Sequence, residues 1–146
     1  MITIDTSIFV DLVFEYDSSR TIKAEEALNI ILEKGLEIIN PTVFKVELAG
    51  VLTRKMQIDK ALEIIKDTLS EVKLIPNPDD LAFEVALKTG SRAADAYFIA
   101  TAKLTNSILI TNDRVMANNA KKYGVDSYYL IEEFNDAKER LRKLRS

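Results

Sequence analysis

The sequence contains no cysteine and no histidine. The absence of cysteine excludes disulfides, zinc ribbons and thiol nucleophiles, and it suits a protein of the reducing cytoplasm. The absence of histidine removes the commonest general base and the commonest transition-metal ligand. Any metal ion bound by this chain would therefore be held by oxygen atoms, which selects hard cations such as Mg²⁺ or Mn²⁺.

Long apolar runs and glycine-rich turns are also missing. No apolar run approaches the roughly 18 residues of a membrane span, and no basic leader precedes an apolar core, so neither a membrane helix nor a signal peptide is expected. A dinucleotide-binding domain would need a glycine-rich first turn, which the four glycines do not form. The 146 residues are expected to make one domain, 1–146, that needs no disulfide or structural metal to fold.

An overall excess of positive charge is missing too. The net charge is −3 and the pI is near 5.1, so a surface that binds nucleic acid would have to be local. The tail KERLRKLRS is one candidate, with five basic residues in eight positions: Lys138, Arg140, Arg142, Lys143 and Arg145. A solvated last helical turn explains the same residues, because cations are favoured near the C-terminus of a helix.

Five short segments are predicted to be buried strands, because they are apolar, rich in β-branched or aromatic residues and without clean alternation. They are Ile2–Ile4, Leu36–Ile39, Val72–Ile75, Ser107–Thr111 and Ser127–Ile131. Helical patterns fill the intervals, at Glu25–Lys34, Asn40 to about Arg54, Asp59–Ser70, Asn77 to Gly90, and Ser91 or Arg92 to about Thr105. Asn40-Pro41 is expected to open its helix with Asn40 as the N-cap and Pro41 in the first turn, and Asn77-Pro78 is expected to start another helix.

Strands that alternate with helices predict an α/β fold of three layers, α/β/α, in which helices cover both faces of a central parallel sheet. Ligands of such folds bind beyond the carboxyl ends of the strands, where the strand order reverses. Asp5 falls just after the first predicted strand, and Asp113 falls just after the fourth. These two acids can meet if the two strands are neighbours.

Four acids stand in awkward places for a carboxylate, and each also has a purely structural explanation. Asp5 and Asp113 are both placed to cap the helix that follows them, with Asn112 as a competitor for the second cap. Glu47 borders an apolar helix stripe, from which it can reach solvent. Asp95 is the only acid in the apolar stretch AADAYFIATAK, near a helix start whose dipole favours it. Burying an unpaired carboxylate costs several kcal/mol, more than that dipole supplies.

These four acids, if the sheet gathers them, would repel one another, and at least one would stay protonated. A divalent cation removes the conflict, and Mg²⁺ usually keeps several waters, which leaves room for a substrate phosphate. The acids therefore indicate metal-assisted phosphoryl chemistry. Asp11, in contrast, is interpreted as a surface residue of the first helix.

The runs IDTSIFVD, VEL, RAADAYFIATA and ILITNDRVM, in this order and at these intervals, resemble the motifs of the PIN-domain ribonucleases. The nearest group is the VapC-type toxins of prokaryotic toxin–antitoxin pairs and their archaeal relatives. The resemblance spans Ile2 to about Leu130. It implies a PIN-like, Rossmann-like sheet ordered 3-2-1-4-5, Mg²⁺- or Mn²⁺-dependent cleavage of single-stranded RNA, and commonly a homodimer. A small antitoxin protein is the partner that a toxin of this kind would have.

The resemblance also assigns individual residues. The acidic quartet of the family maps onto Asp5, Glu47, Asp95 and Asp113, as catalytic residues and metal ligands. Ser7 stands where members carry Asn or Ser, Thr111 fills a Ser or Thr position near the metal, and Thr6 opens the helix beside Asp5. Asn112 departs from the pattern because it is uncharged, so Asp113 alone would serve that corner of the site.

Three basic residues, Lys45, Arg92 and Arg114, lie close in sequence to quartet acids and could either hold an RNA backbone or pair with those acids. Other enzyme classes fit less well. A haloacid-dehalogenase-like phosphatase would need an acid at position 7, where Ser7 stands, and a receiver domain would need its phosphoacceptor after the third strand, where Asp79 is better explained as a helix-start acid. The remaining alternative is a catalytically silent PIN-like module that binds RNA or a protein partner.

Overall fold

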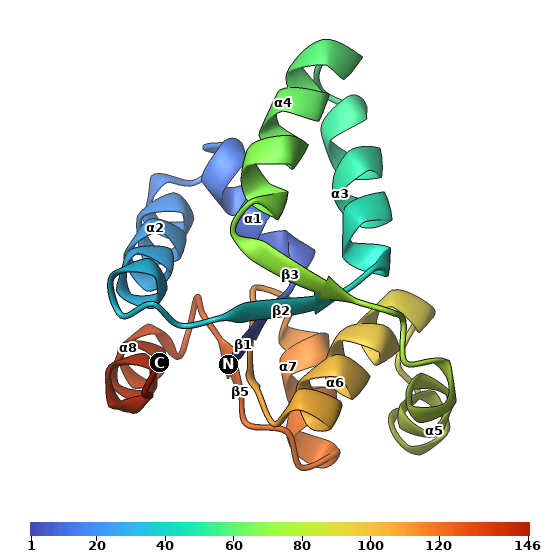
Figure 1. Ribbon diagram of the computed structural model, residues 1–146. Coiled ribbons are helices and arrows are strands. Elements are labelled where there is room, and N and C mark those ends of the chain that lie inside the picture. Colours follow the sequence, from blue (N-terminus) through green and yellow to red (C-terminus); the bar gives the residue numbers. More distant parts are fainter.

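The computed structural model describes residues 1–146, in which five strands and eight helices form three layers (Figure 1). The strands are β1 (Ile2–Ile4), β2 (Ile38–Pro41), β3 (Val72–Ile75), β4 (Ile108–Thr111) and β5 (Ser127–Tyr129). The helices are α1 (Thr6–Val13), α2 (Ser18–Glu33), α3 (Val43–Thr53), α4 (Ile58–Leu69), α5 (Asp79–Thr89), α6 (Ala93–Thr105), α7 (Arg114–Lys122) and α8 (Phe134–Lys143).

The sheet is parallel throughout and its strand order is β3-β2-β1-β4-β5, which confirms the predicted fold and order. β1 is the central strand, and it pairs with β4 in the register Ile2 with Ile108 and Ile4 with Ile110. All residues of β1 and β4 are buried, as expected for strands with both faces covered. The strand order reverses between β1 and β4, so their carboxyl ends form the crevice where α/β folds place ligands.

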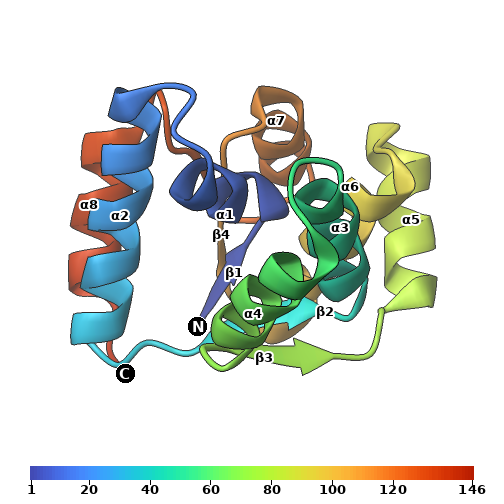
Figure 2. The ribbon, with the colours of Figure 1, turned by 90° about the horizontal axis from the view of Figure 1, so that it is seen from above.

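Helices cover both faces of the sheet. Figure 1 shows α3 and α4 on one side and α6 and α7 on the other. Figure 2, seen from above, shows α2 beside α8 at one edge of the molecule and α5 beside α6 at the opposite edge, and both pairs are in contact. None of the eight helices is long and apolar enough to cross a membrane.

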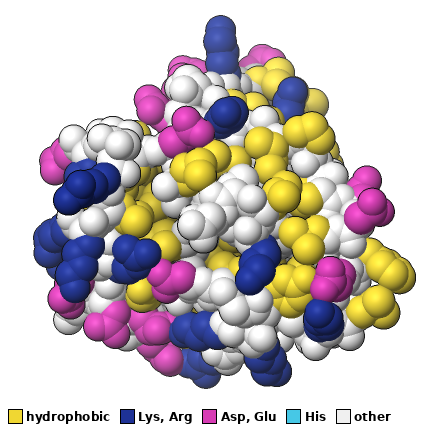
Figure 3. All heavy atoms as spheres, turned by 60° about the horizontal axis from the view of Figure 1, so that its bottom comes forward, with side chains coloured by type: hydrophobic (Ala, Val, Ile, Leu, Met, Phe, Trp, Pro, Cys, Tyr) yellow, Lys and Arg dark blue, Asp and Glu magenta, His cyan; other side chains and the backbone are white.

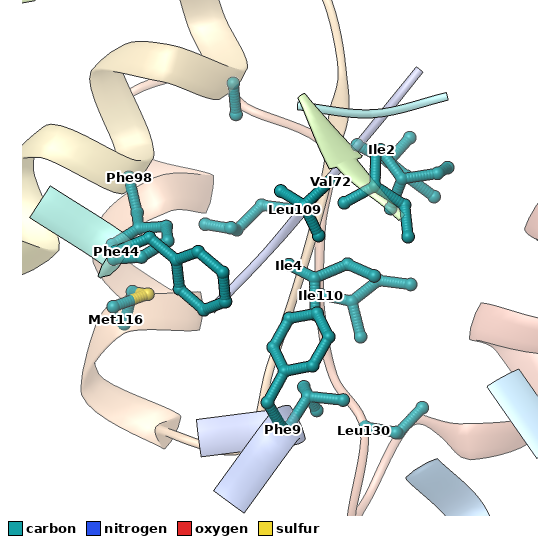
Figure 4. Packing of buried hydrophobic residues seen from close by; sticks show 14 of the residues in the cluster. Ile2, Ile4, Phe9, Phe44, Val72, Phe98, Leu109, Ile110, Met116 and Leu130 are labelled. Carbon is teal, nitrogen blue, oxygen red and sulfur yellow. The ribbon is translucent and has the colours of Figure 1, made fainter. Parts of the chain in front are cut away.

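The hydrophobic core joins the sheet to the helices on each side. Phe44 of α3 packs against Phe9 of α1 with ring centroids 5.1 Å apart and against Phe98 of α6 at 6.4 Å. Figure 4 shows these rings beside Met116 of α7 and the strand side chains, including Ile4. Three helices that carry candidate site residues, α1, α3 and α6, are therefore fixed to one another by one aromatic cluster.

The predicted helix start at Asn40 is wrong, because Asn40 and Pro41 belong to β2 and α3 begins only at Val43. The register of β1 with β2 is limited to Ile2 with Ile38. Beyond that pair, the buried Asn40 side chain takes over the hydrogen bonds: its Oδ1 accepts from the Ile4 N–H at 3.0 Å and its Nδ2 donates to the Ile4 carbonyl at 2.8 Å. The amide thus replaces a peptide group of a neighbouring strand, which outweighs the local Asn-Pro preference.

Other element ends also differ from the predicted ones. β2 begins two residues later than predicted, and α2 begins at Ser18 instead of Glu25 because Asp17 caps it, accepting from the Ser19 N–H at 2.9 Å. The start of α5 after Asn77 and its end at Gly90, which has φ 72°, agree with the sequence. Left-handed backbone of this kind favours glycine at a helix C-terminus.

The surface is divided by residue type. Figure 3 shows charged side chains crowding the left side, where α8 lies in Figure 1, and hydrophobic side chains gathering toward the right, where α5 lies. Three of the basic tail residues form ion pairs: Lys138 with Glu26, Arg140 with Asp126, and Lys143 with Glu139. This pairing supports the interpretation of the tail as a solvated helix end.

The role of Asn40 gives a stability prediction. Asn40→Leu keeps the side-chain size but leaves the buried N–H and carbonyl of Ile4 without partners, and each such group costs about 1–3 kcal/mol. We expect urea unfolding to show a loss of about 2–5 kcal/mol. Asn118→Leu, on the exposed face of α7, is the matched control and should change stability by less than about 0.5 kcal/mol. Equal effects of the two substitutions would refute the role given to Asn40.

Candidate active site

Asp5 lies at the carboxyl end of β1 and is only 5% exposed. Its N–H donates to the Ile110 carbonyl at 3.0 Å, which extends the pairing of β1 with β4 by one residue. It occupies the N-cap position of α1, but its side chain does not cap the helix. Instead, Oδ2 accepts from the Ser7 hydroxyl at 2.6 Å and from the Thr111 hydroxyl at 2.8 Å. Both hydroxyls use the same oxygen, so Oδ1 has no hydroxyl partner.

Glu47 comes to the same edge on α3. It is half-buried, and its Oε1 accepts from the Thr6 hydroxyl at 2.8 Å, which ties α3 to the first turn of α1. This position agrees with its predicted place at the border of the apolar stripe. Burial raises the pKa of both Glu47 and Asp5 above the ordinary range, and the hydroxyl bonds from Thr6, Ser7 and Thr111 partly oppose that effect.

Asp95 lies in the first turn of α6 and is half-buried. Its pKa is raised to about 6, first by burial and then by the nearby carboxylates of Asp113, Asp5 and Glu47, while Arg92 acts in the opposite direction. No hydrogen bond compensates its charge, unlike that of the other three acids. The sequence predicts that gathered acids repel one another, and in the structure Asp95 is the acid whose pKa is raised by the other three.

Asp113 follows β4 and does cap a helix: its Oδ1 accepts from the Met116 N–H at 3.1 Å at the start of α7. The hydroxyl of Thr111 links it to Asp5, because that oxygen accepts from the Asp113 N–H at 2.9 Å and donates to Asp5. The structural explanation of Asp113 is therefore correct, and it leaves Oδ2 of the same carboxylate available.

The four acids line one open pocket of about 590 Å³ at the carboxyl edge of the sheet, together with Thr6 and Ser7. As the side chains stand, no group of three or more acids is arranged so that it could hold a metal ion. The donor set nevertheless suits a hard cation, because it consists of carboxylate oxygens without histidine or cysteine. A cation would also relieve the repulsion recorded in the raised pKa of Asp95.

The three basic candidates differ in position. Arg92 lines the pocket, whereas Lys45 and Arg114 do not. Arg114 is paired with Glu132, and its guanidinium lies 5.4 Å from the ring centroid of Tyr129. None of the three forms an ion pair with a quartet acid, so only Arg92 is placed to meet a ligand of this pocket.

The interpretation of Asp11 as a surface residue is wrong, because Asp11 is 3% exposed and lines the pocket. Its Oδ2 accepts from the guanidinium of Arg20 at 3.2 and 3.3 Å and from the amide of Asn112. Arg20 and Tyr16 also line this pocket and were missed by the sequence analysis. No local pattern marks them, since Arg20 meets Asp11 across the turn between α1 and α2.

Comparisons with known proteins agree with the fold. A family model described as the PIN domain matches residues 2–122. Among solved structures, 17 chains match. PAE2754 from Pyrobaculum aerophilum aligns with a TM-score of 0.61 and 22% identity over 92% of this chain and 96% of that chain. FitAcB from Neisseria gonorrhoeae aligns with a TM-score of 0.61 and 17% identity over 88% of this chain and 96% of that chain. These identities show a shared fold alone, and no curated protein sequence matches this chain.

The raised pKa of Asp95 predicts an unusual pH dependence of stability. Because its pKa is about 6 in the folded state and near 3.8 in the unfolded state, the folded state binds more protons between these values. The contribution of Asp95 is thus most favourable below pH 3.8 and is lost as the pH rises through about 6. In EDTA, Asp95→Asn should match the native chain near pH 4 and exceed it at pH 7.5 by about 1–2 kcal/mol, a figure discounted for the solvent screening of a half-buried group.

Thermal or urea unfolding across this pH range measures the difference. Asp67→Asn, at an exposed position of α4, is the control and should show a difference that does not vary with pH. A constant difference between Asp95→Asn and the native chain would contradict the assignment of the raised pKa to Asp95.

Proposed function

The chain belongs to the PIN-domain family, whose members are typically metal-dependent nucleases, and on that premise we propose that it is a Mg²⁺- or Mn²⁺-dependent endoribonuclease acting on single-stranded RNA. The observation that carries the proposal is the gathering of four carboxylates from separate elements at one pocket, where three of them raise the pKa of the fourth. Such a set is costly for the metal-free fold and suits an oxygen-bound cation.

Asp5 and Asp95 would be the principal metal ligands, with Glu47 and Asp113 completing the site directly or through water. A bound ion would polarise a phosphate and lower the pKa of a bound water. It would thereby activate the water without a histidine base, which this chain lacks. The protein holds the carboxylates in place: hydroxyls fix one oxygen of Asp5 and one of Glu47, and the start of α7 fixes one of Asp113.

The pocket contains both negative and positive side chains, and they act on an RNA phosphate in opposite ways. Four carboxylates would repel a phosphate placed directly beside them, and a bound cation would offset that repulsion. Arg92 stands at the pocket next to Asp95, where its charge both lowers the cost of ionising Asp95 and attracts a phosphate. The protein would therefore bind RNA through this local patch although its net charge is −3.

The biological role that we propose is the toxin of a toxin–antitoxin pair, acting as a homodimer that a small antitoxin protein controls. The support is the set of VapC-like motifs in the sequence. One observation favours a second candidate, a catalytically silent PIN-like module that binds RNA or protein: the acids, as they stand, are not arranged to hold a metal ion. RNA cleavage and metal binding distinguish the two functions.

We expect RNA cleavage to depend on the two principal metal ligands, Asp5 and Asp95. Asp5→Asn and Asp95→Asn should each lower Mg²⁺-dependent cleavage of single-stranded RNA by more than about 100-fold, since even residues that only orient metal ligands are worth 10–100-fold. The circular dichroism spectrum should stay unchanged, and the exposed Asp67→Asn should retain full activity. Full activity of both site variants would refute the proposed metal ligands.

We also expect the protein to bind Mn²⁺ in the absence of RNA. Mn²⁺ at about 100 times its Kd should stabilise the native protein by about 2.7 kcal/mol, seen as a rise of several degrees in Tm. Asp95→Asn should abolish the rise and Asp67→Asn should keep it. A native protein whose Tm does not respond to Mn²⁺ would favour the silent module.

A further inference from the structure

The pocket is also lined by Tyr16 and Asp17 from the turn between α1 and α2 and by Arg20 from the first turn of α2, and this wall carries no quartet acid. Tyr16 is 59% exposed although it lines the pocket. Its ring centroid lies 5.7 Å from that of Phe14, and Lys55 lies 4.2 Å from the ring centroid and donates to the phenol oxygen. An exposed aromatic ring is thus held at the pocket, with a cation beside it.

Arg20 stands on the same wall with donors to spare. Asp11 accepts from its Nε and one Nη2 proton, which leaves three of the five guanidinium N–H groups without a protein partner. The side chain is 38% exposed and lines the pocket, so these donors can reach a ligand. Asp17, which also lines the pocket, forms no ion pair with Arg20, and its Oδ1 accepts from the Ser19 N–H as the cap of α2.

A continuous chain of hydrogen bonds connects Arg20 to the acid cluster. Asp11 holds both Arg20 and the amide of Asn112. The Asn112 backbone N–H donates to the Ser7 oxygen at 2.9 Å, and the Ser7 hydroxyl donates to Asp5 at 2.6 Å. Because most of these groups are buried, the distance between Arg20 and Asp5 is fixed by the fold.

We propose that Tyr16 and Arg20 form a nucleotide subsite beside the acid cluster, in which a base stacks on Tyr16 and an adjacent phosphate binds Arg20. An aromatic ring next to a cation is the recurring platform for unpaired bases, because every base has a face that can stack. A planar guanidinium with free N–H groups suits a phosphate. This inference rests on the proposed function and adds to it a binding position for one nucleotide of the single strand, beside the acid cluster.

Binding without cleavage tests the stacking half. In EDTA and in the Asp95→Asn background, a single-stranded oligoribonucleotide of about eight residues with a central 2-aminopurine should bind with quenching of its fluorescence. Adding Tyr16→Leu should weaken binding about 10-fold and remove the quenching, whereas Tyr16→Phe should retain both. Phe83→Leu, at an exposed aromatic outside this pocket, should leave both unchanged. In the native background, Tyr16→Leu should lower kcat/KM for single-stranded RNA by about 10-fold.

Salt dependence tests the phosphate half. For single strands, each phosphate contact contributes about −0.7 to the slope of log K against log salt. Arg20→Gln should therefore reduce that slope by about 0.7, and Arg145→Gln, at the exposed end of the chain, should not change it. Urea unfolding of Arg20→Gln checks that the fold persists. An unchanged slope in a folded Arg20→Gln protein overturns the role of Arg20.

The outcomes separate this inference from the proposed function. If the native protein cleaves RNA and Tyr16→Leu matches it in cleavage, affinity and quenching, the subsite is refuted and the nuclease stands. If no RNA is cleaved with either metal but binding and quenching depend on Tyr16, the subsite stands and the nuclease is refuted. If the labelled strand is neither bound nor cleaved, both are refuted.

Discussion

The hydrogen bond from Thr111 to Asp5, 2.8 Å long, joins residues 106 positions apart and depends on β1 lying beside β4. Burial opposes the ionised form of Asp5, and this bond, together with the one from Ser7, offsets part of that cost. The same Thr111 oxygen receives the N–H of Asp113, so one hydroxyl orders two acids. With another strand order, Asp5 would lose the Thr111 bond and keep only the hydroxyl of Ser7 as a partner. The topology is thus a condition for the site as well as for the fold.

The site retains electrostatic strain that the rest of the protein does not relieve. Hydroxyls and a helix start support three of the acids, while Asp95 receives no hydrogen bond and experiences the charge of all the others. A fold selected only for stability would have an amide or an apolar residue there, since unpaired buried charge is costly. The aromatic cluster of Phe9, Phe44 and Phe98 fixes the three helices α1, α3 and α6 against this repulsion. Packing in the core therefore offsets the free-energy cost of holding the four acids close together.

The sequence predicts the sheet and the position of Asp5 and Asp113 because both follow from patterns that are local: apolar strands, and acids directly after them. It does not predict the role of Asn40, since the Asn-Pro pair locally favours a helix start. The bonds of the Asn40 amide to Ile4 depend on β1 lying beside β2, which is a long-range contact. Asp11 was misassigned for a related reason. Its partners are Arg20, across a turn, and Asn112, 101 positions away, and neither is visible to helical periodicity.

Asn112 is uncharged where the resemblance to the family motif implies an acid, and the structure shows the contacts that it makes there. Its Nδ2 donates to the buried carboxylate of Asp11, while its Oδ1 is buried without a partner, so donation to Asp11 sets the orientation of the amide. An acid at position 112 would place a second negative charge within hydrogen-bond distance of Asp11 and would remove a donor from it. Arg20 would then be drawn between two carboxylates and would have fewer N–H groups without a protein partner. The uncharged Asn112 thus keeps Asp11 available for Arg20 and leaves the acidic corner to Asp113.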